Sequence, residues 1–308
     1  MRIEILGSAA GGGFPQWNCN CTNCQSLRAG TFQGSPRTQT QVAVTNNNQQ
    51  WFLLGASPDL RLQIEAARFL HPRAGLRNSP IHGVILTSAD VDQVAGLLSL
   101  RELQPLQVFS TPSLKKILRE DNSMFGMLNR APDQVTWKEI QPGQDFPLPA
   151  LDGSTSGLAC SPISLGHRFP AYVPSVREGM SPEESLLGLI VTSASGKRVA
   201  YMPAVPVIGD AFLRLLEGVD LLLFDGTFWT DDELIRVQGS GATAQEMGHV
   251  PVSGPEGTLQ KLSGLNRPRK VFIHINNTNP MLNESGREYR EVQNAGWEVA
   301  HDGWSMEL

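Results

Sequence analysis

Three of the four cysteines in this chain, Cys19, Cys21 and Cys24, lie within one six-residue segment that follows a glycine-rich turn. With this C-x-C-x2-C spacing, three thiolates can converge on one ion from a single short loop, as in tetrahedral zinc sites. A disulfide would leave one of the three thiols over, and the fourth cysteine, Cys160, is far away in the sequence. The spacing therefore predicts a structural zinc site, with a fourth ligand from elsewhere in the chain.

The composition is that of a globular protein in a reducing compartment. The chain has 308 residues, of which 40% are hydrophobic and 18% charged, and its formal net charge is −5. This charge does not favour nucleic-acid binding, which usually requires a basic surface. Neither a secretory signal nor an apolar run long enough to cross a membrane is recognisable. We therefore expect a cytoplasmic protein, in which thiolates suit metal binding better than disulfides.

The alternation of strand-like and helix-like segments predicts an α/β fold. We expect strands at Ile3–Leu6, Gln41–Thr45, Trp51–Leu54, Gly83–Thr87, Val135–Ile140, Leu158–Ser164, Leu186–Thr192, Arg198–Met202, Asp220–Phe224, Val271–Ile275, Trp297–Ala300 and Ser305–Glu307. We expect helices at Pro58–Phe69, Val91–Leu103, Asp210–Glu217, Gly257–Leu262 and Glu284–Ala295. Two such runs predict one αββα domain over 1–308, with two mixed sheets face to face and helices outside. Residues 141–157 and 166–184 are expected to be loop insertions.

The segment 86–98 joins a buried strand to a helix through a polar loop. It resembles the metallo-β-lactamase superfamily, whose motif at this place reads T-H-x-H-x-D-H-x-x-G-L. The residues that match the motif are Thr87, Asp92, Gly96 and Leu97, and the residues at its three histidine positions are Ser88, Asp90 and Gln93. A two-metal hydrolase needs the missing imidazoles to hold its ions, so the resemblance argues against dinuclear zinc hydrolysis.

Longer blocks resemble the PqqB family of this superfamily, which acts in pyrroloquinoline quinone (PQQ) biosynthesis. They run from one end of the chain to the other and comprise Leu6–Cys21, Ala56–Asp59, Leu223–Thr227, Met247–His249, His274–Pro280 and Ala300–Gly303. The resemblance implies a metallo-β-lactamase-like fold with one remodelled metal site. It also implies an Fe(II)-dependent oxygenase that hydroxylates a tyrosine-derived PQQ precursor.

By the same resemblance, Asp92 and His274 bind the active-site metal, and the family's other histidine falls at Gln93. Asp90 either joins this set or caps the helix that follows, and Asp92 alternatively complements the helix dipole. A set of two carboxylates and one imidazole would also suit manganese, and zinc is a further alternative. His249 would donate a hydrogen bond to the substrate or shuttle a proton.

The fourth ligand of the cysteine site is expected in the segment after the strand Val271–Ile275. In related phosphodiesterases the equivalent segment supplies one residue to the active-site metal and one to the structural zinc. By that analogy Asn277, or alternatively His274, completes the zinc site.

Two functions remain open from the sequence. The first is the hydroxylase, with the PQQ precursor as its substrate and other PQQ-pathway proteins as partners. The alternative is a non-catalytic carrier that binds PQQ or its precursor for transport toward the periplasm. Gln93 favours the carrier, as does Ala242–Ala244, where the family has a cationic Lys/Arg-Thr-Gly segment suited to an acidic ligand.

Overall fold

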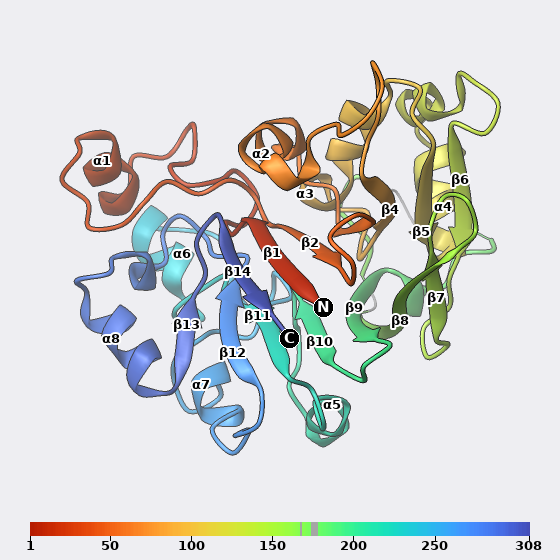
Figure 1. The fold of residues 1–308 in the computed structure, drawn as a ribbon. Helices are drawn as coiled ribbons and strands as arrows, with labels where there is room; N and C mark the ends of the chain where they lie inside the picture. The colour runs from red at the N-terminus through yellow and green to blue at the C-terminus, as the bar shows by residue number, and fades with distance from the viewer. Residues whose placement is uncertain (167, 174–177) are drawn as a thin grey trace. The chain divides into compact units, whose positions relative to one another are not determined.

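The computed structural model describes residues 1–166, 168–173 and 178–308, whose strands form two seven-stranded sheets (Figure 1). The order of the first sheet is β14 (Trp304–Glu307), β1 (Arg2–Gly7), β2 (Gln41–Thr45), β3 (Trp51–Leu54), β4 (Ile81–Ile85), β5 (Leu106–Ser110) and β6 (Val135–Glu139). The order of the second is β13 (Trp297–Val299), β12 (Arg269–Ile273), β11 (Leu221–Asp225), β10 (Arg198–Met202), β9 (Leu186–Ser193), β8 (Thr155–Gly166) and β7 (Phe146–Pro149). Each sheet contains parallel and antiparallel pairs, as predicted.

Contacts within the chain divide it into two compact units. The first comprises Met1–Leu6, Gln41–Lys197 and Gly303–Leu308, and the second comprises Gly7–Thr40 and Arg198–Asp302. One domain over 1–308 therefore stays a prediction. The expected insertion at 141–157 contains β7 and the start of β8, and the one at 166–184 includes residues 167 and 174–177, which lie outside the described residues.

In the first unit, the segment after β4 is tightly packed. The helix expected over Val91–Leu103 is shorter: α3 (Val91–Val94) passes into a 3-10 turn, η2 (Ala95–Leu100). Two backbone bonds hold it against the neighbouring loop, from Ala56 N to Gln93 O at 2.7 Å and from Gly96 N to Ala56 O at 2.9 Å. A Cβ on Gly96 would lie only 2.1 Å from the carbonyl oxygen of Ser57, so only glycine fits this approach.

In the second unit, β10 to β13 are all parallel, so their carboxyl ends meet at one edge. The helices of this unit are α1 (Thr22–Arg28), α5 (Asp210–Leu215), α6 (Glu233–Gln238), α7 (Thr258–Lys261) and α8 (Arg287–Asn294). At the shared edge, β11 ends at Asp225 and β12 at Ile273, one residue before His274.

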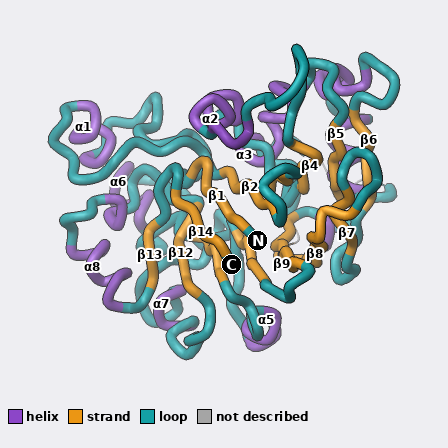
Figure 2. Tube along the Cα trace, in the orientation of Figure 1, coloured by secondary structure: helices purple, strands orange, loops and turns teal. Residues whose placement is uncertain are grey.

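A long segment of the second unit, residues 8–40, is mostly loop apart from α1 (Figure 2). Both of its ends are fixed by one carboxylate, Asp302. Its oxygens accept hydrogen bonds from the amide and hydroxyl of Ser8, at 3.0 and 2.9 Å, and from the amide and hydroxyl of Thr38, both at 2.7 Å. These hydrogen bonds hold both ends of a segment that has little regular structure, and this segment includes the three clustered cysteines.

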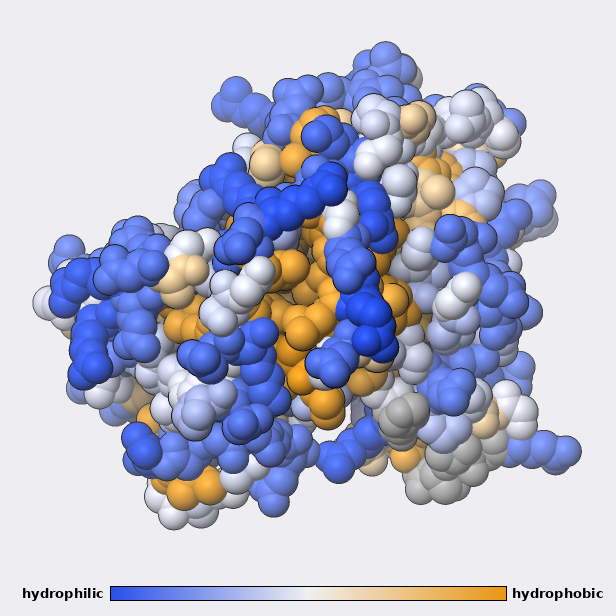
Figure 3. Space-filling view, turned by 90° about the horizontal axis from the view of Figure 1, so that it is seen from below, coloured by the Kyte–Doolittle hydropathy of each residue, from blue (hydrophilic) through white to orange (hydrophobic). Residues whose placement is uncertain are grey.

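The surface is mixed in character. On the face drawn in Figure 3, hydrophilic residues surround a central area where hydrophobic residues gather. Large hydrophobic side chains are also exposed in the second unit, among them Trp17, Val237 and Met247. Across the described ranges, no helix has the length and apolar character needed to cross a membrane.

We predict that Gly96→Ala destabilises the protein by about 3 kcal/mol or more, because the new methyl group overlaps backbone atoms that cannot move aside cheaply. Urea unfolding of the two proteins measures this difference. Gly126→Ala is the matched control, because a Cβ at Gly126 meets nothing within 4 Å. Equal unfolding free energies for the Gly96 variant and the parent would contradict the close packing of η2.

Candidate metal centres

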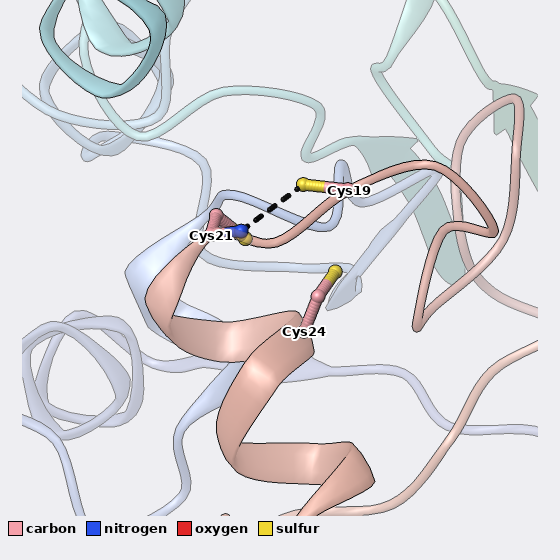
Figure 4. Close-up of side chains that lie close together, drawn as sticks. All are labelled: Cys19, Cys21 and Cys24. Atoms are coloured by element: carbon pink, nitrogen blue, oxygen red, sulfur yellow. Dashed lines mark hydrogen bonds between the residues drawn. The ribbon is translucent and has the colours of Figure 1, made fainter.

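The three clustered cysteines face one point in space (Figure 4). Cys21 occupies the N-cap of α1, Cys24 lies in its first turn, and Cys19 belongs to the preceding loop. Their sulfur atoms all lie within 4.8 Å of one another, and the Cys21 amide donates to Cys19 Sγ at 3.4 Å. Arg28 closes the loop by donating to the carbonyls of Cys19 and Gln16, each at 2.5 Å.

The side chain of Asn277 reaches this cluster from the loop that follows β12. Its amide nitrogen lies 3.1 Å from Cys19 Sγ, 3.6 Å from Cys21 Sγ and 3.3 Å from Cys24 Sγ. The edges of a regular tetrahedron around zinc, with bonds near 2.0–2.3 Å, are about 3.5 Å long. The Asn277 amide thus lies where a fourth tetrahedral ligand would, and exchanging its O and N atoms would turn the oxygen toward the sulfurs.

The thiols of this cluster influence one another. Burial tends to raise the pKa of Cys19, but hydrogen bonds from the Cys21 amide, the neighbouring thiols and Asn277 outweigh it and lower this pKa. Burial and the nearby Cys24 raise the pKa of Cys21 to about 11. Like charges at this separation disfavour each other, so a cation among the sulfurs is what would ionise all three.

A second cluster lies at the carboxyl edge of the parallel strands, where Asp225, His249 and His274 place ligand atoms within 4.8 Å of one another. All three are buried. The imidazole rings of His249 and His274 stack with their centroids 5.5 Å apart. His274 has a φ of 54°, which is uncommon for a residue with a Cβ and turns the chain sharply at the end of β12.

The carboxylate of Asp225 is saturated with hydrogen bonds. One oxygen accepts from the Thr227 amide at 3.0 Å and from its hydroxyl at 2.6 Å. The other accepts from the Val205 amide at 2.9 Å and lies 2.7 Å from His249 Nδ1. A carboxylate has about four acceptor positions, so Asp225 serves to orient its neighbours rather than to bind an ion.

The Thr227 hydroxyl links both histidines to this carboxylate. It lies 2.8 Å from His274 Nδ1 and 3.1 Å from His249 Nδ1. If the hydroxyl gives its one proton to Asp225 or to the backbone carbonyl oxygen of His274, at 2.6 and 2.9 Å, it accepts from the His274 ring, whose Nδ1 then has the proton. Both rings are then held by Nδ1 and present Nε2 as their metal-binding atom.

The charges of this cluster favour an ionised Asp225. Burial alone would raise its pKa, but His249, His274 and the Thr227 hydroxyl outweigh burial and hold the pKa below its usual value. The cluster therefore has a fixed negative charge behind its two imidazoles.

The strand-end motif of the first unit has a different hydrogen-bond network. Asp90 stands at the N-cap of α3 but makes no capping bond with its side chain, which accepts from the Ser88 hydroxyl at 2.7 Å. Gln93 is buried, and its amide accepts from the Thr87 hydroxyl at 3.1 Å and donates to Asp92 at 3.4 Å. Asp92 belongs to the first unit and His274 to the second, so their shared metal site stays a prediction.

The chain was compared with known proteins. The model of the beta-lactamase superfamily domain matches residues 50–275. The coenzyme PQQ synthesis protein B of Methylorubrum extorquens is 42% identical, and that of Pseudomonas putida is 41% identical, each over the full length of both chains. This chain belongs to the PqqB family. The crystal structure of Zn2+-bound PqqB from Methylobacterium extorquens superposes on the whole chain with a TM-score of 0.91 and 41% identity, which confirms the predicted family and metallo-β-lactamase-like fold.

Asp225 and Thr227 were not among the candidate site residues from the sequence, although both lie in the family-like block Leu223–Thr227. The signal was an acid at the end of the apolar run Leu221–Phe224, at an edge where ligands gather in parallel sheets. His249, expected near the cleft, is buried and held by Asp225.

We predict that Thr227→Val lowers the free energy of unfolding by about 1–3 kcal/mol, because Asp225 and His274 Nδ1 both lose a buried hydrogen-bond partner. Chemical denaturation measures the loss. Thr136→Val makes the same change at an exposed position of β6 and is expected to be nearly neutral. Equal losses in the two variants would show that the Thr227 hydroxyl does not hold the cluster together.

Proposed function

We propose that this chain acts in coenzyme PQQ synthesis as a metal-dependent oxygenase that hydroxylates a tyrosine-derived precursor of PQQ. Membership of the PqqB family supports the pathway. The observation that supports metal chemistry is the buried imidazole of His274, held through Nδ1 by Thr227, beside the imidazole of His249, which Asp225 holds. Metal-binding histidines typically have their second nitrogen held by a carboxylate or a hydrogen-bond acceptor in this way.

For the first metal, we propose that Cys19, Cys21, Cys24 and Asn277 hold zinc. Three sulfurs and one amide at tetrahedral separations fit this ion. The zinc would fix the loop of residues 8–40 in the second unit, a structural task separate from the chemistry.

For the second metal, we propose His274 Nε2 and the Asp92 carboxylate as ligands, with Asp90 as a further carboxylate. Asp225 orients the two imidazoles, and His249, hydrogen-bonded to Asp225, holds or moves a proton near the substrate. One imidazole and one or two carboxylates suit ferrous iron or manganese and leave coordination positions open. A bound ferrous ion would supply the activation of dioxygen, while the chain supplies the oriented groups and the buried surroundings.

The second candidate function is a carrier of PQQ or its precursor. Gln93 favours it, because a neutral amide already engaged with Thr87 and Asp92 stands where the family has a metal-binding imidazole. In that case the fold would bind the ligand without turning it over. Tight binding of PQQ by protein without iron would support this alternative.

We predict that Gln93→His increases the affinity for Fe(II) by about tenfold or more, because a strong nitrogen donor replaces a weak amide oxygen beside Asp92. Anaerobic titration with Fe(II) measures the affinity, and oxygen uptake with the tyrosine-derived precursor measures turnover. Gln144→His adds an imidazole at an exposed position and is the control for unspecific iron binding.

The parent protein is expected to consume oxygen only when both iron and precursor are present. A parent that binds no iron and consumes no oxygen, while it binds PQQ tightly, would contradict the oxygenase and leave the carrier. An unchanged affinity in Gln93→His would show that residue 93 faces away from the metal.

A further inference from the structure

We propose that the fourth position of the cysteine metal site is exchangeable, and that a small thiol enters from a neighbouring cavity and replaces the Asn277 amide on the metal. The inference rests on the zinc site proposed above and is independent of the hydroxylation. It assigns to this site the binding of a sulfur-bearing small molecule in addition to its structural task.

The donor set itself is unequal. Three ligands are cysteine sulfurs, and the fourth group at tetrahedral separation from them is a neutral amide, which zinc binds more weakly than thiolate or imidazole. Structural zinc sites are normally closed by four cysteine or histidine ligands, whereas sites that exchange ligands keep one weak or open position. With three sulfurs and one amide, this donor set resembles that of a site that exchanges ligands.

The weak position lies beside empty space. A cavity of about 640 Å³ is lined by Cys19, Cys21 and Asn277 together with residues of α6. Cys19 and Cys21 are partly exposed, while Cys24 is buried below them. Asn277 is itself buried, so a molecule in this cavity enters beside Cys19 and Cys21 and reaches the metal when the Asn277 side chain turns away.

The cavity wall indicates which ligand would enter. None of the described residues that line it is charged, so it offers no ion pair to a phosphate or a carboxylate. The wall combines side-chain amides, such as those of Asn18 and Gln238, with the apolar side chains of Val237 and Met247. An uncharged molecule with a thiol group fits this wall, and its sulfur is the donor that a thiolate-bound zinc prefers.

The exchange is a simple ligand substitution. The thiol releases its proton to solvent, its sulfur forms a bond to the metal, and the bond from the metal to the Asn277 oxygen breaks. No oxidant or reductant takes part, and the released amide can return when the thiol leaves.

Cobalt-loaded protein tests the proposal, because absorption from thiolate-to-cobalt charge transfer reports the sulfur atoms bound to the metal. With 2-mercaptoethanol as the probe, this absorption is expected to rise by about one third, because the metal then has four sulfur ligands instead of three. Ethylene glycol, its hydroxyl counterpart, is expected to change nothing. Absorption that stays constant, or falls because the thiol removes the cobalt, would overturn the proposal.

Two variants at Asn277 make the result specific. Asn277→Ala removes the competing amide and is expected to respond at lower thiol concentration than the parent. Asn277→Cys supplies a fourth sulfur from the chain, so its absorption should start higher and stay constant with thiol. A rise in Asn277→Cys equal to that of the parent would place the thiol on another metal and overturn the assignment.

The same experiment separates failure here from failure of the zinc site. If cobalt gives no thiolate absorption before thiol is added, the cysteines hold no metal and the zinc site itself is wrong. If the absorption is present and insensitive to thiol in both the parent and Asn277→Ala, only the exchange is wrong. Neither result depends on oxygen chemistry.

Discussion

The turn from His274 to Asn279 is the constraint on which both candidate metal centres depend. The first residue of the turn, His274, directly follows β12 and has a left-handed backbone conformation. Backbone hydrogen bonds fix the turn, from Ile275 N to Ser8 O at 3.0 Å and from Ala10 N to Ile275 O at 2.9 Å. The side chain of Asn279 donates to the carbonyl oxygen of Gly226 at 3.0 Å. Within six residues the turn presents His274 to the imidazole cluster and Asn277 to the cysteines.

A buried carboxyl group supports this turn from α6. Glu233 accepts from the Thr278 hydroxyl and from the Trp229 amide, both at 2.5 Å. Burial raises its pKa to about 7, although these hydrogen bonds act in the opposite direction. The two centres are thus held by one hydrogen-bonded network, and a change that displaces the turn is expected to disturb both of them.

Local patterns of the sequence were sufficient for much of this structure. The cysteine spacing predicted a cluster whose sulfurs do converge, and alternating apolar residues located most strands within two residues of their ends. The strands β5 and β7 and the helices α1, α4 (Pro112–Arg119) and α6 were not predicted, because they are short, although α4 does have apolar residues at helical spacing. The expected helix Val91–Leu103 was too long, since it ends where Gly96 packs against Ser57.

What the sequence could not provide was contact between distant segments. Asp225 bonds to Thr227 two residues away, but its bonds to Val205 and His249 span 20 and 24 residues, and no local pattern connects those positions. The same holds for Asn277, which lies 258 residues from Cys19 and yet contacts its sulfur. Family resemblance pointed to this segment, but the tetrahedral separations and the hydrogen-bond partners of the histidine rings follow only from the structure.

The most direct measurement is anomalous X-ray diffraction from crystals soaked in Zn2+ and, separately, in Mn2+ as a redox-stable substitute for ferrous iron. The account predicts a zinc peak among the three cysteine sulfurs next to Asn277, and a manganese peak bonded to His274 Nε2 and the Asp92 carboxylate. Manganese bound by Asp225 in place of Asp92, or no peak within bonding distance of His274, would contradict it.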